Sequence, residues 1–291
     1  MRGVPIAESF GIQLFISSIP YMVWMDASRW ILPDLASALA WARERNGQGI
    51  RCTLALAGEF ARTPGQAGSA ADGNLRCIAG IAVAGLDASL SVKPSALGGL
   101  FDPEACRGHA TGLAREAARS GVPLELDMEG RNSVDSTLDI AAGCRRENPR
   151  VMVALQAYLD RTPGDIRNMV SLGIGVRLVK GAYLGDVSDY RQVRGRMKEC
   201  AGILQDLGAS FSLGTHDPVL IGWAMEEFAD GKDLVEFGFL KGLSDETKIR
   251  LASGGWRVSE YVPYGRGEEG YVTRRERYLA NLAGAGLAPA P

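Results

Sequence analysis

Short apolar runs alternate with longer helical patterns along this chain, beginning near Ile50. Eight runs have the length and the flanking turn residues of buried strands. These runs are Ile50–Ala57, Ala88–Lys93, Pro123–Met128, Val151–Gln156, Gly175–Lys180, Ser210–Gly214, Leu234–Gly238 and Trp256–Tyr261. Helical patterns lie between them, for example Pro103–Ser120, Ser133–Arg146, Arg191–Leu207 and Pro218–Phe228. Because a connection between parallel strands needs roughly a dozen residues or more, this order predicts a parallel sheet covered by helices.

Polar side chains stand near the carboxyl end of each predicted strand. They are Glu59, Lys93, Asp127, Glu129, Gln156, Arg177, Lys180, Thr215, His216, Glu236 and Tyr261. In a closed barrel these ends meet at one mouth, where barrel enzymes carry their chemistry, whereas a doubly wound open sheet spreads them along an edge. Any one of these residues could simply end a strand. Their recurrence at all eight strands favours an α/β fold of the (β/α)8 TIM-barrel type.

One further helical pattern precedes the first predicted strand. Trp30–Arg45 is amphipathic, and Asn46-Gly47 is a stop signal for a helix. We therefore expect residues 1–47 to form an N-terminal helical extension that packs on a barrel of residues 48–291.

The composition narrows the class of protein. Of the 291 residues, 46% are hydrophobic and 23% are charged, as in a folded globular protein with a sizeable core. The formal net charge of −2 gives no overall positive field, so we expect no nucleic-acid partner. The two histidines, His109 and His216, are too far apart for a helix-borne metal pair, and we expect no metal. The five cysteines should be reduced and buried, as in a cytoplasmic protein: Cys52, Cys77, Cys106, Cys144 and Cys200.

Phe10–Met25 carries no charge but is too short for a membrane span and contains Gln13 and Pro20. We expect this segment to pack on the domain, with peripheral contact to a membrane surface as the alternative. The expected location is therefore the cytoplasm, with the membrane surface left open.

The segment Gly175-Val-Arg-Leu-Val-Lys-Gly-Ala-Tyr183 carries two cations at the end of a strand. Alternation puts Arg177 and Lys180 on opposite faces, and Gly181 would let the backbone approach a ligand closely. Such cations suit an anion or an electron-rich ring. Lys180 could equally be a Schiff-base nucleophile or pair with a neighbouring carboxylate.

Arg177-Leu-Val-Lys-Gly-Ala-Tyr183 resembles the signature strand of the proline dehydrogenase family. Members of that family are flavoenzymes that oxidise L-proline to Δ1-pyrroline-5-carboxylate on a (β/α)8 barrel. Other segments resemble the family in the same order: Leu56-Ala-Gly-Glu59, Ser91-Val-Lys-Pro-Ser-Ala-Leu97, Leu126-Asp-Met-Glu129, Leu155-Gln-Ala-Tyr-Leu159, Gly214-Thr-His-Asp-Pro218, Val235-Glu-Phe237, Tyr261-Val-Pro-Tyr-Gly265 and Arg274-Arg275. The resemblance covers roughly residues 30 to 280, which makes chance agreement improbable.

The resemblance implies a substrate site for L-proline. Arg274 and Arg275 would hold the carboxylate, because guanidinium groups offer a planar fork that matches two oxygens. Lys93 would add a third positive charge, and Asp127 would hold Lys93 or Tyr261 in place. The walls of the ring site would be Tyr183, Leu240 and Tyr261. Hydride would pass directly from the ring carbon beside the neutral amine to the flavin.

The resemblance also implies a cofactor site for FAD, with FMN as the alternative. The residues implied are Asp127, Gln156, Arg177, Lys180, Gly181, Ala182, Thr215 and His216. A cation such as Arg177 near the flavin nitrogens would stabilise the reduced ring. His216 is expected to bind the cofactor rather than to transfer a proton.

Three positions depart from the family pattern. Gly238 stands where the family often has glutamine, Lys241 where it has an aromatic residue or histidine, and Tyr278 where it usually has an acid. The stretch Gly265–Gly270 matches GxGxxG, but no further strand with an acidic residue can follow it, so we interpret it as a turn before the last helix.

Two other classes of function stay open at this stage. One is a flavin-independent barrel enzyme, such as an aldolase with Lys180 as its nucleophile, and the other is a noncatalytic binding barrel. If the chain is a proline dehydrogenase, a separate pyrroline-5-carboxylate dehydrogenase is expected, because no second catalytic domain fits in this length. The electron acceptor is expected to be a quinone.

Overall fold

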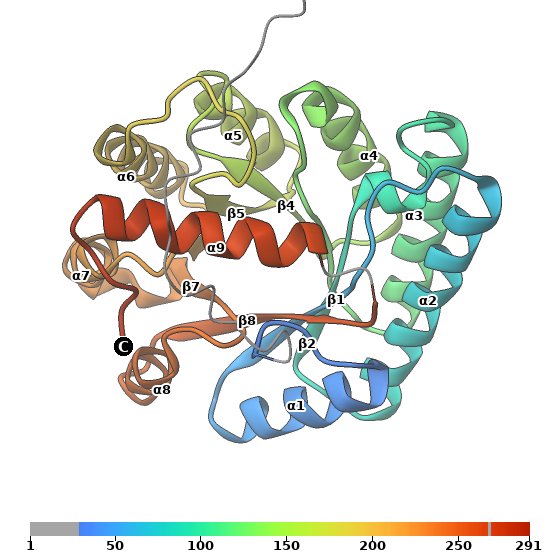
Figure 1. Cartoon of the computed structure of the whole chain (residues 1–291), viewed down its shortest axis with the longest axis horizontal. Helices are drawn as coiled ribbons and strands as arrows, with labels where there is room; N and C mark the ends of the chain where they lie inside the picture. Colours follow the sequence, from blue (N-terminus) through green and yellow to red (C-terminus); the bar gives the residue numbers. More distant parts are fainter. Residues whose placement is uncertain (1–28, 267–268) are drawn as a thin grey trace, which may run out of the picture.

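The computed structural model describes residues 29–266 and 269–291, and it contains a closed barrel of eight parallel strands (Figure 1). Each strand pairs with the next in sequence, and the last pairs with the first, where Thr53 lies opposite Tyr261. The strands are β1 (Arg51–Leu56), β2 (Ala88–Val92), β3 (Leu124–Leu126), β4 (Val151–Gln156), β5 (Gly175–Val179), β6 (Phe211–Gly214), β7 (Val235–Leu240) and β8 (Arg257–Tyr264). The predicted (β/α)8 barrel is confirmed, and the open sheet is excluded.

Helices surround the barrel, and several begin with the same local signal. The helices are α1 (Leu35–Gly47), α2 (Pro64–Val83), α3 (Pro103–Arg119), α4 (Val134–Glu147), α5 (Thr162–Ser171), α6 (Tyr190–Asp206), α7 (Pro218–Glu227), α8 (Asp245–Ser253) and α9 (Glu269–Gly284), with 3-10 turns η2 (Pro94–Leu97), η3 (Arg131–Ser133) and η4 (Ala229–Leu234). Thr63, Asp102 and Asp217 each cap a helix whose first residue is proline. The cap accepts a free backbone N–H, and proline has none to leave unsatisfied, so the pair fixes where each helix starts.

The two faces of the strands differ in polarity. Leu54, Leu90 and Leu178 are fully buried in the apolar core. The barrel interior is polar, because Glu125 accepts hydrogen bonds from Thr53 and Ser89. The five cysteines are all buried, as predicted.

The helix α1 begins later than predicted. Leu32 lies beside Tyr264 as an isolated parallel bridge, and Asp34 caps the helix by accepting the N–H of Ser37 at 2.8 Å. Pro33 holds the preceding residue in extended backbone, which explains the late start. The boundary between residues 47 and 48 stays a prediction.

Two expectations about strand ends are wrong. Glu236 is the second residue of β7, and it pairs with Arg51 at 3.1 Å and lies near Arg257, at the amino ends of β1 and β8. It therefore belongs to the barrel end opposite the mouth. Tyr261 lies within β8, which continues to Tyr264 because it pairs with the whole of β1.

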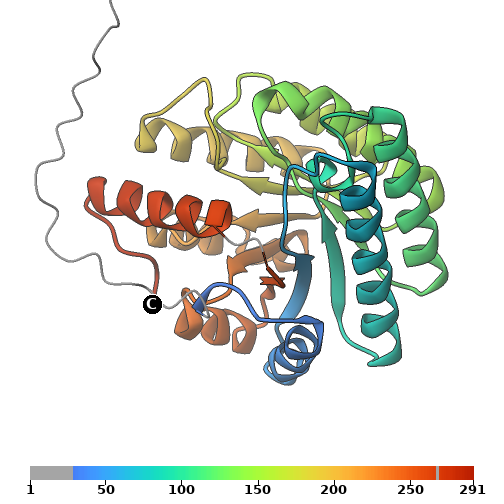
Figure 2. The ribbon, with the colours of Figure 1, turned by 45° about the vertical axis from the view of Figure 1, so that its right-hand side comes forward.

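Helix α9 runs across the ring of strands, and both views place it on the side of α6 and α7 (Figure 1, Figure 2). Gly265 has a positive φ of 101°, which turns the chain after β8 toward this helix. The segment Phe10–Met25 lies outside the described residues. In the described part of the chain, no helix is both long and apolar enough to cross a membrane.

Candidate active site

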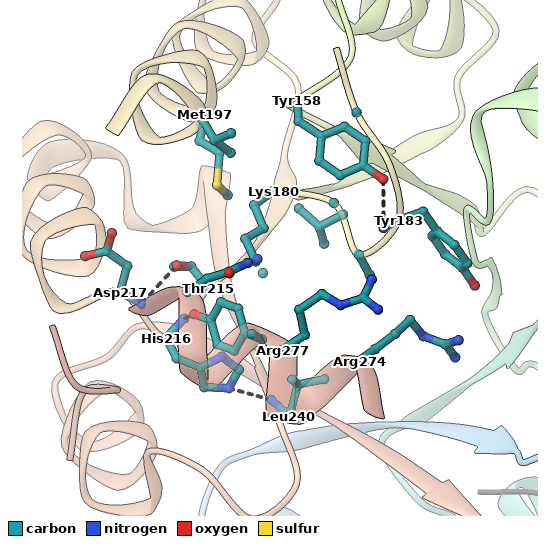
Figure 3. A pocket seen from close by; sticks show the side chains of 18 of the residues that line it. Tyr158, Lys180, Tyr183, Met197, Thr215, His216, Asp217, Leu240, Arg274 and Arg277 are labelled. Atoms are coloured by element: carbon teal, nitrogen blue, oxygen red, sulfur yellow. Dashed lines mark hydrogen bonds between the residues drawn. The ribbon is translucent and has the colours of Figure 1, made fainter. Parts of the chain in front are cut away.

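A cavity of about 860 Å³ opens at the carboxyl ends of the strands (Figure 3). Its floor is built from small or short side chains: Thr53, Ala154, Gly214, Gly238 and Ser259. Its outer walls come from the β5–α6 segment, from α6 and from α9. Helix α9 thus closes one side of the mouth and contributes cationic side chains to it.

Four side chains form a tight cluster at the inner end of the cavity. The Tyr261 hydroxyl donates to Asp127 Oδ2 at 2.6 Å, and Lys93 Nζ lies 3.3 Å from the same oxygen and 3.2 Å from the Tyr261 hydroxyl. Arg177 makes a short ion pair with Asp127 Oδ1, and its other terminal nitrogen lies 3.3 Å from Glu125. The strands β2, β3, β5 and β8 therefore bring together four groups that are far apart in sequence.

Charge fixes the protonation of this cluster. Burial alone would raise the pKa of Asp127, but Lys93 and Arg177 outweigh it and hold that pKa well below the usual range. Burial opposes the charge of Lys93, yet its neighbours Tyr261 and Asp127 raise the Lys93 pKa above the ordinary value. Burial, followed by the Asp127 charge, raises the pKa of Tyr261. At neutral pH the cluster therefore holds a carboxylate, two cations and a neutral phenol.

Helix α9 places two arginines and a tyrosine over this cluster. Tyr271 stacks on Tyr261 with ring centroids 6.4 Å apart and 14° between the planes. The Arg275 guanidinium lies 4.6 Å from the Tyr271 ring centroid, and its Nε is buried without a hydrogen-bond partner among the described residues. Arg274 pairs with Glu59 and lies 5.3 Å from the ring centroid of Tyr183. The arginine pair thus lines the cavity and does not project into solvent.

A third set of side chains, Lys180, His216 and Tyr278, lines the cavity farther from the inner cluster. The Lys180 amine lies 4.6 Å from the ring centroid of Tyr278, and burial together with the positive charge of Arg275 lowers the Lys180 pKa to about 8. His216 Nε2 accepts the backbone N–H of Leu240 at 3.0 Å, and its own backbone N–H donates to the Tyr278 hydroxyl. Burial, then the charges of Lys248 and Arg275, puts the His216 pKa well below its ordinary value. A neutral His216 whose Nε2 is engaged suits a positioning role, in line with the expectation that it does not transfer protons.

The sequence profile described as Proline dehydrogenase matches residues 38–196. This chain belongs to the proline dehydrogenase family. Proline dehydrogenase 1 of Bacillus subtilis (strain 168) is 30% identical over 263 residues, which are 88% of this chain and 87% of the relative. Proline dehydrogenase of Deinococcus radiodurans is 31% identical over 275 residues, 87% of this chain and 86% of the relative.

Solved structures extend the fold comparison. The proline utilization A protein of Bdellovibrio bacteriovorus, inactivated by N-propargylglycine, has a TM-score of 0.78 at 20% identity. The match covers 88% of this chain and 32% of that protein. The family assignment and this likeness agree with the barrel, and members of the proline dehydrogenase family are flavin-dependent.

The cavity brings together nearly all the residues that the sequence singled out. Those lining it are Lys93, Asp127, Arg177, Lys180, Gly181, Ala182, Tyr183, Thr215, His216, Leu240, Tyr261, Arg274 and Arg275. Gln156 is not among the lining residues. Its side-chain amide donates to the backbone oxygen of Glu129 at 2.8 Å, and its Oε1 is buried without a partner among the described residues.

Sequence reasoning missed several residues of the site. Tyr271 lies three and four positions before the two arginines, so it shares their face of α9, and this spacing was a usable signal. Tyr190, Arg194 and Arg277 also line the cavity. They lie between or after the segments in which the family motifs were recognised, so no motif indicated them.

The residues of the cavity fit a flavin. Arg177 Nε is a buried donor without a partner among the described residues, and such an atom suits a hydrogen bond to a ring nitrogen. Gly214 and Gly238 line the floor and add no side chain to it. At Gly238 even a Cβ would be too close to a neighbour, because it would lie 2.9 Å from Ser212 Oγ. The Lys180 amine suits a flavin phosphate. Glycine at position 238, where the family often has glutamine, therefore leaves this part of the floor without a side chain.

Proposed function

We propose that this chain oxidises L-proline to Δ1-pyrroline-5-carboxylate, with a bound flavin as the hydride acceptor. The observation that carries the proposal is one cavity lined both by cations and by tyrosine rings. The cations are Lys93, Arg274 and Arg275, and the rings are Tyr183, Tyr261 and Tyr271. L-Proline combines one carboxylate with one compact apolar ring, and this combination of charged groups on an apolar wall suits both.

Arg275 and Arg274 would bind the substrate carboxylate, because a guanidinium presents a planar fork to two oxygens. Lys93 would add positive charge from below, held by Asp127 and Tyr261. The tyrosine rings would orient the carbon beside the amine, and orientation accounts for much of the rate in such a reaction. L-Proline loses this hydride and one amine proton as the carbon–nitrogen double bond forms. The chemistry that a bound flavin supplies is acceptance of the hydride.

We further propose FAD as the flavin. The cavity extends outward between α6 and α9, where Arg191, Arg194 and Arg277 line it. At the end of α9 and just after it, this part is also lined by the small residues Ala280, Gly284 and Ala285. A second phosphate and a nucleoside would use this cationic extension, whereas FMN would leave it empty.

The identity of the flavin has a direct test. Flavin released by heat should gain fluorescence on phosphodiesterase treatment, as a dinucleotide does and FMN does not. Gly284→Leu should weaken binding of FAD and leave binding of FMN unchanged, because it adds bulk only to the outer part of the cavity. Equal loss for both flavins would contradict the placement.

The activity itself is tested by adding L-proline to the purified protein without oxygen. The expected result is bleaching of the flavin absorption, and glycine serves as the control because it has the carboxylate but no ring. A colourless protein that borohydride traps with a carbonyl substrate on Lys180 would overturn the proposal in favour of a Schiff-base enzyme. Bound flavin that L-proline never bleaches would indicate a binding protein without this activity.

The remaining expectations belong to the same proposal. A quinone would reoxidise the flavin, and a separate pyrroline-5-carboxylate dehydrogenase would consume the product. We place the protein in the cytoplasm, with contact to a membrane surface through Phe10–Met25 as a further expectation. Reduction of a soluble quinone by L-proline, with and without added vesicles, tests the acceptor and the contact together.

A further inference from the structure

Tyr158, which follows β4, fills the space beside the β5–α6 segment. Its side chain is buried, with 5% of the residue exposed. A Cβ on Gly181 would lie 1.8 Å from this ring, and a Cβ on Gly185 would lie 2.3 Å from it. The two glycines therefore face the tyrosine ring, and the close approach that requires Gly181 is an approach to Tyr158.

Four backbone groups of the segment bond to Tyr158, the first of them being the oxygen of Lys180, which accepts the Tyr158 N–H at 3.1 Å. The N–H of Tyr183 donates to the Tyr158 hydroxyl at 2.9 Å (Figure 3). The N–H groups of Asp186 and Val187 donate to the Tyr158 backbone oxygen at 3.1 and 3.2 Å. Burial, as the largest effect, raises the Tyr158 pKa to about 12, so the phenol stays neutral at working pH. Tyr158 thus holds residues 183–187 at both ends, through its hydroxyl at Tyr183 and through its backbone oxygen at Asp186 and Val187.

Among the described residues, contacts on the outer side hold the far end of this stretch. The Asp186 carboxylate pairs with Arg131 at 2.5 Å and accepts the N–H of Asp160 at 2.9 Å. These bonds lie after Gly185 and involve exposed groups. The part that faces the cavity is supported from within by Tyr158.

The supported part carries a wall of the site. Lys180, Ala182, Tyr183 and Leu184 all line the cavity. The Tyr183 ring also lies against the Arg274 guanidinium, at 5.3 Å. A shift of the Tyr183 backbone would therefore move the wall of the ring site together with a neighbour of the arginine pair.

We propose that Tyr158 is a positioning residue: its hydroxyl fixes the backbone of Tyr183 and thereby sets the affinity of the site for a ring-bearing carboxylate. The proposal rests on the proposed function for the identity of the substrate. Tyr158 is itself one of the residues that line the cavity, but its hydroxyl accepts the N–H of Tyr183 and takes no part in hydride transfer.

The test is Tyr158→Phe, which keeps the ring between the glycines and removes the hydroxyl. Hydrogen exchange should be faster at the Tyr183 amide and unchanged at Asp186 and Val187, whose acceptor is the backbone oxygen. KM for L-proline should rise by about 2- to 10-fold, the range expected for one hydrogen bond, while kcat stays within twofold. Tyr264→Phe is the matched control, because it removes a buried hydroxyl from a residue outside the cavity.

Competitive inhibition separates the tyrosine wall from the arginine pair that would bind the carboxylate. Cyclopentanecarboxylate should bind the Tyr158→Phe variant more weakly by the same factor as L-proline, and acetate should bind as it does to the unaltered protein. Equal weakening of both inhibitors, or faster exchange at Tyr183 with unchanged KM, would overturn the proposal. If the unaltered protein does not oxidise L-proline, the proposed function fails, while exchange at Tyr183 and inhibitor binding still decide the role of Tyr158.

Discussion

Lys180 should make flavin binding depend on pH. Its pKa is lowered to about 8, because the amine is buried and lies near the positive charge of Arg275. A flavin phosphate held by Lys180 would favour the protonated amine, so binding above pH 8 requires proton uptake. Between pH 7 and pH 9 the protonated fraction of a group with this pKa falls from about nine-tenths to about one-tenth. Apparent affinity should fall by the same factor, about tenfold.

Equilibrium titration of the apoprotein with FAD, followed by quenching of flavin fluorescence, measures this dependence. Lys180→Arg should bind with nearly constant affinity between pH 7 and pH 9, because a guanidinium stays charged. Lys180→Met should bind weakly at both values, and this variant reports any titration of the flavin itself. An affinity of the unaltered protein that is flat over this range would refute the placement of the phosphate at Lys180.

Three further predictions test other parts of the structure. Arg275→Lys should raise KM for L-proline by about tenfold or more, because a planar fork becomes a point charge; unchanged steady-state kinetics would show that Arg275 does not bind the substrate carboxylate. Lys248→Met removes the 2.7 Å ion pair of the fully buried Glu260 carboxylate, which keeps Arg45 and the indole N–H of Trp41 as partners, and should lower the unfolding free energy in guanidinium chloride by about 3 kcal/mol; a loss below about 1 kcal/mol would mean that the remaining partners suffice. The lowered pKa of Asp127 contributes stability above pH 4 or so that is lost in acid, so melting of Asp127→Asn should depend less on pH between 3 and 6 than melting of the unaltered protein, and parallel curves would contradict this.

The sequence predicted the barrel because its strands are short, apolar and separated by helices with clear start signals. Asp102-Pro103 and Asp217-Pro218 are local signals that need no tertiary information. The inner cluster could be predicted for a related reason. Once parallel strands close into a barrel, residues at their carboxyl ends must converge, so Lys93 and Asp127 meet although they are far apart in the chain.

The errors arose where neighbours across the sheet decide the outcome. Glu236 lies at the amino end of its strand because β7 is in register with Arg257, and no property of its own segment reveals that register. Tyr261 was predicted to end its strand, yet β8 continues to Tyr264 because β1 pairs with it along its full length. Gln156 ends its strand as expected, but its amide donates to the backbone oxygen of Glu129 and the residue is not among those that line the cavity. Such choices depend on hydrogen-bond partners that only the fold brings into reach.

The balance of charge shows why the cavity should be filled by anions. In the inner cluster the carboxylates of Glu125 and Asp127 match the cations of Arg177 and Lys93. Toward the mouth the balance changes, because Arg275 and Lys180 lie against tyrosine rings. Buried positive charge of this kind destabilises a fold until an anion binds. A ligand that binds only the folded state raises its stability in proportion to the logarithm of ligand concentration, so melting temperature should rise with flavin, which brings phosphate, and further with a ring carboxylate. Neutral analogues of the two ligands should change the melting temperature little, because they leave the buried cations unpaired.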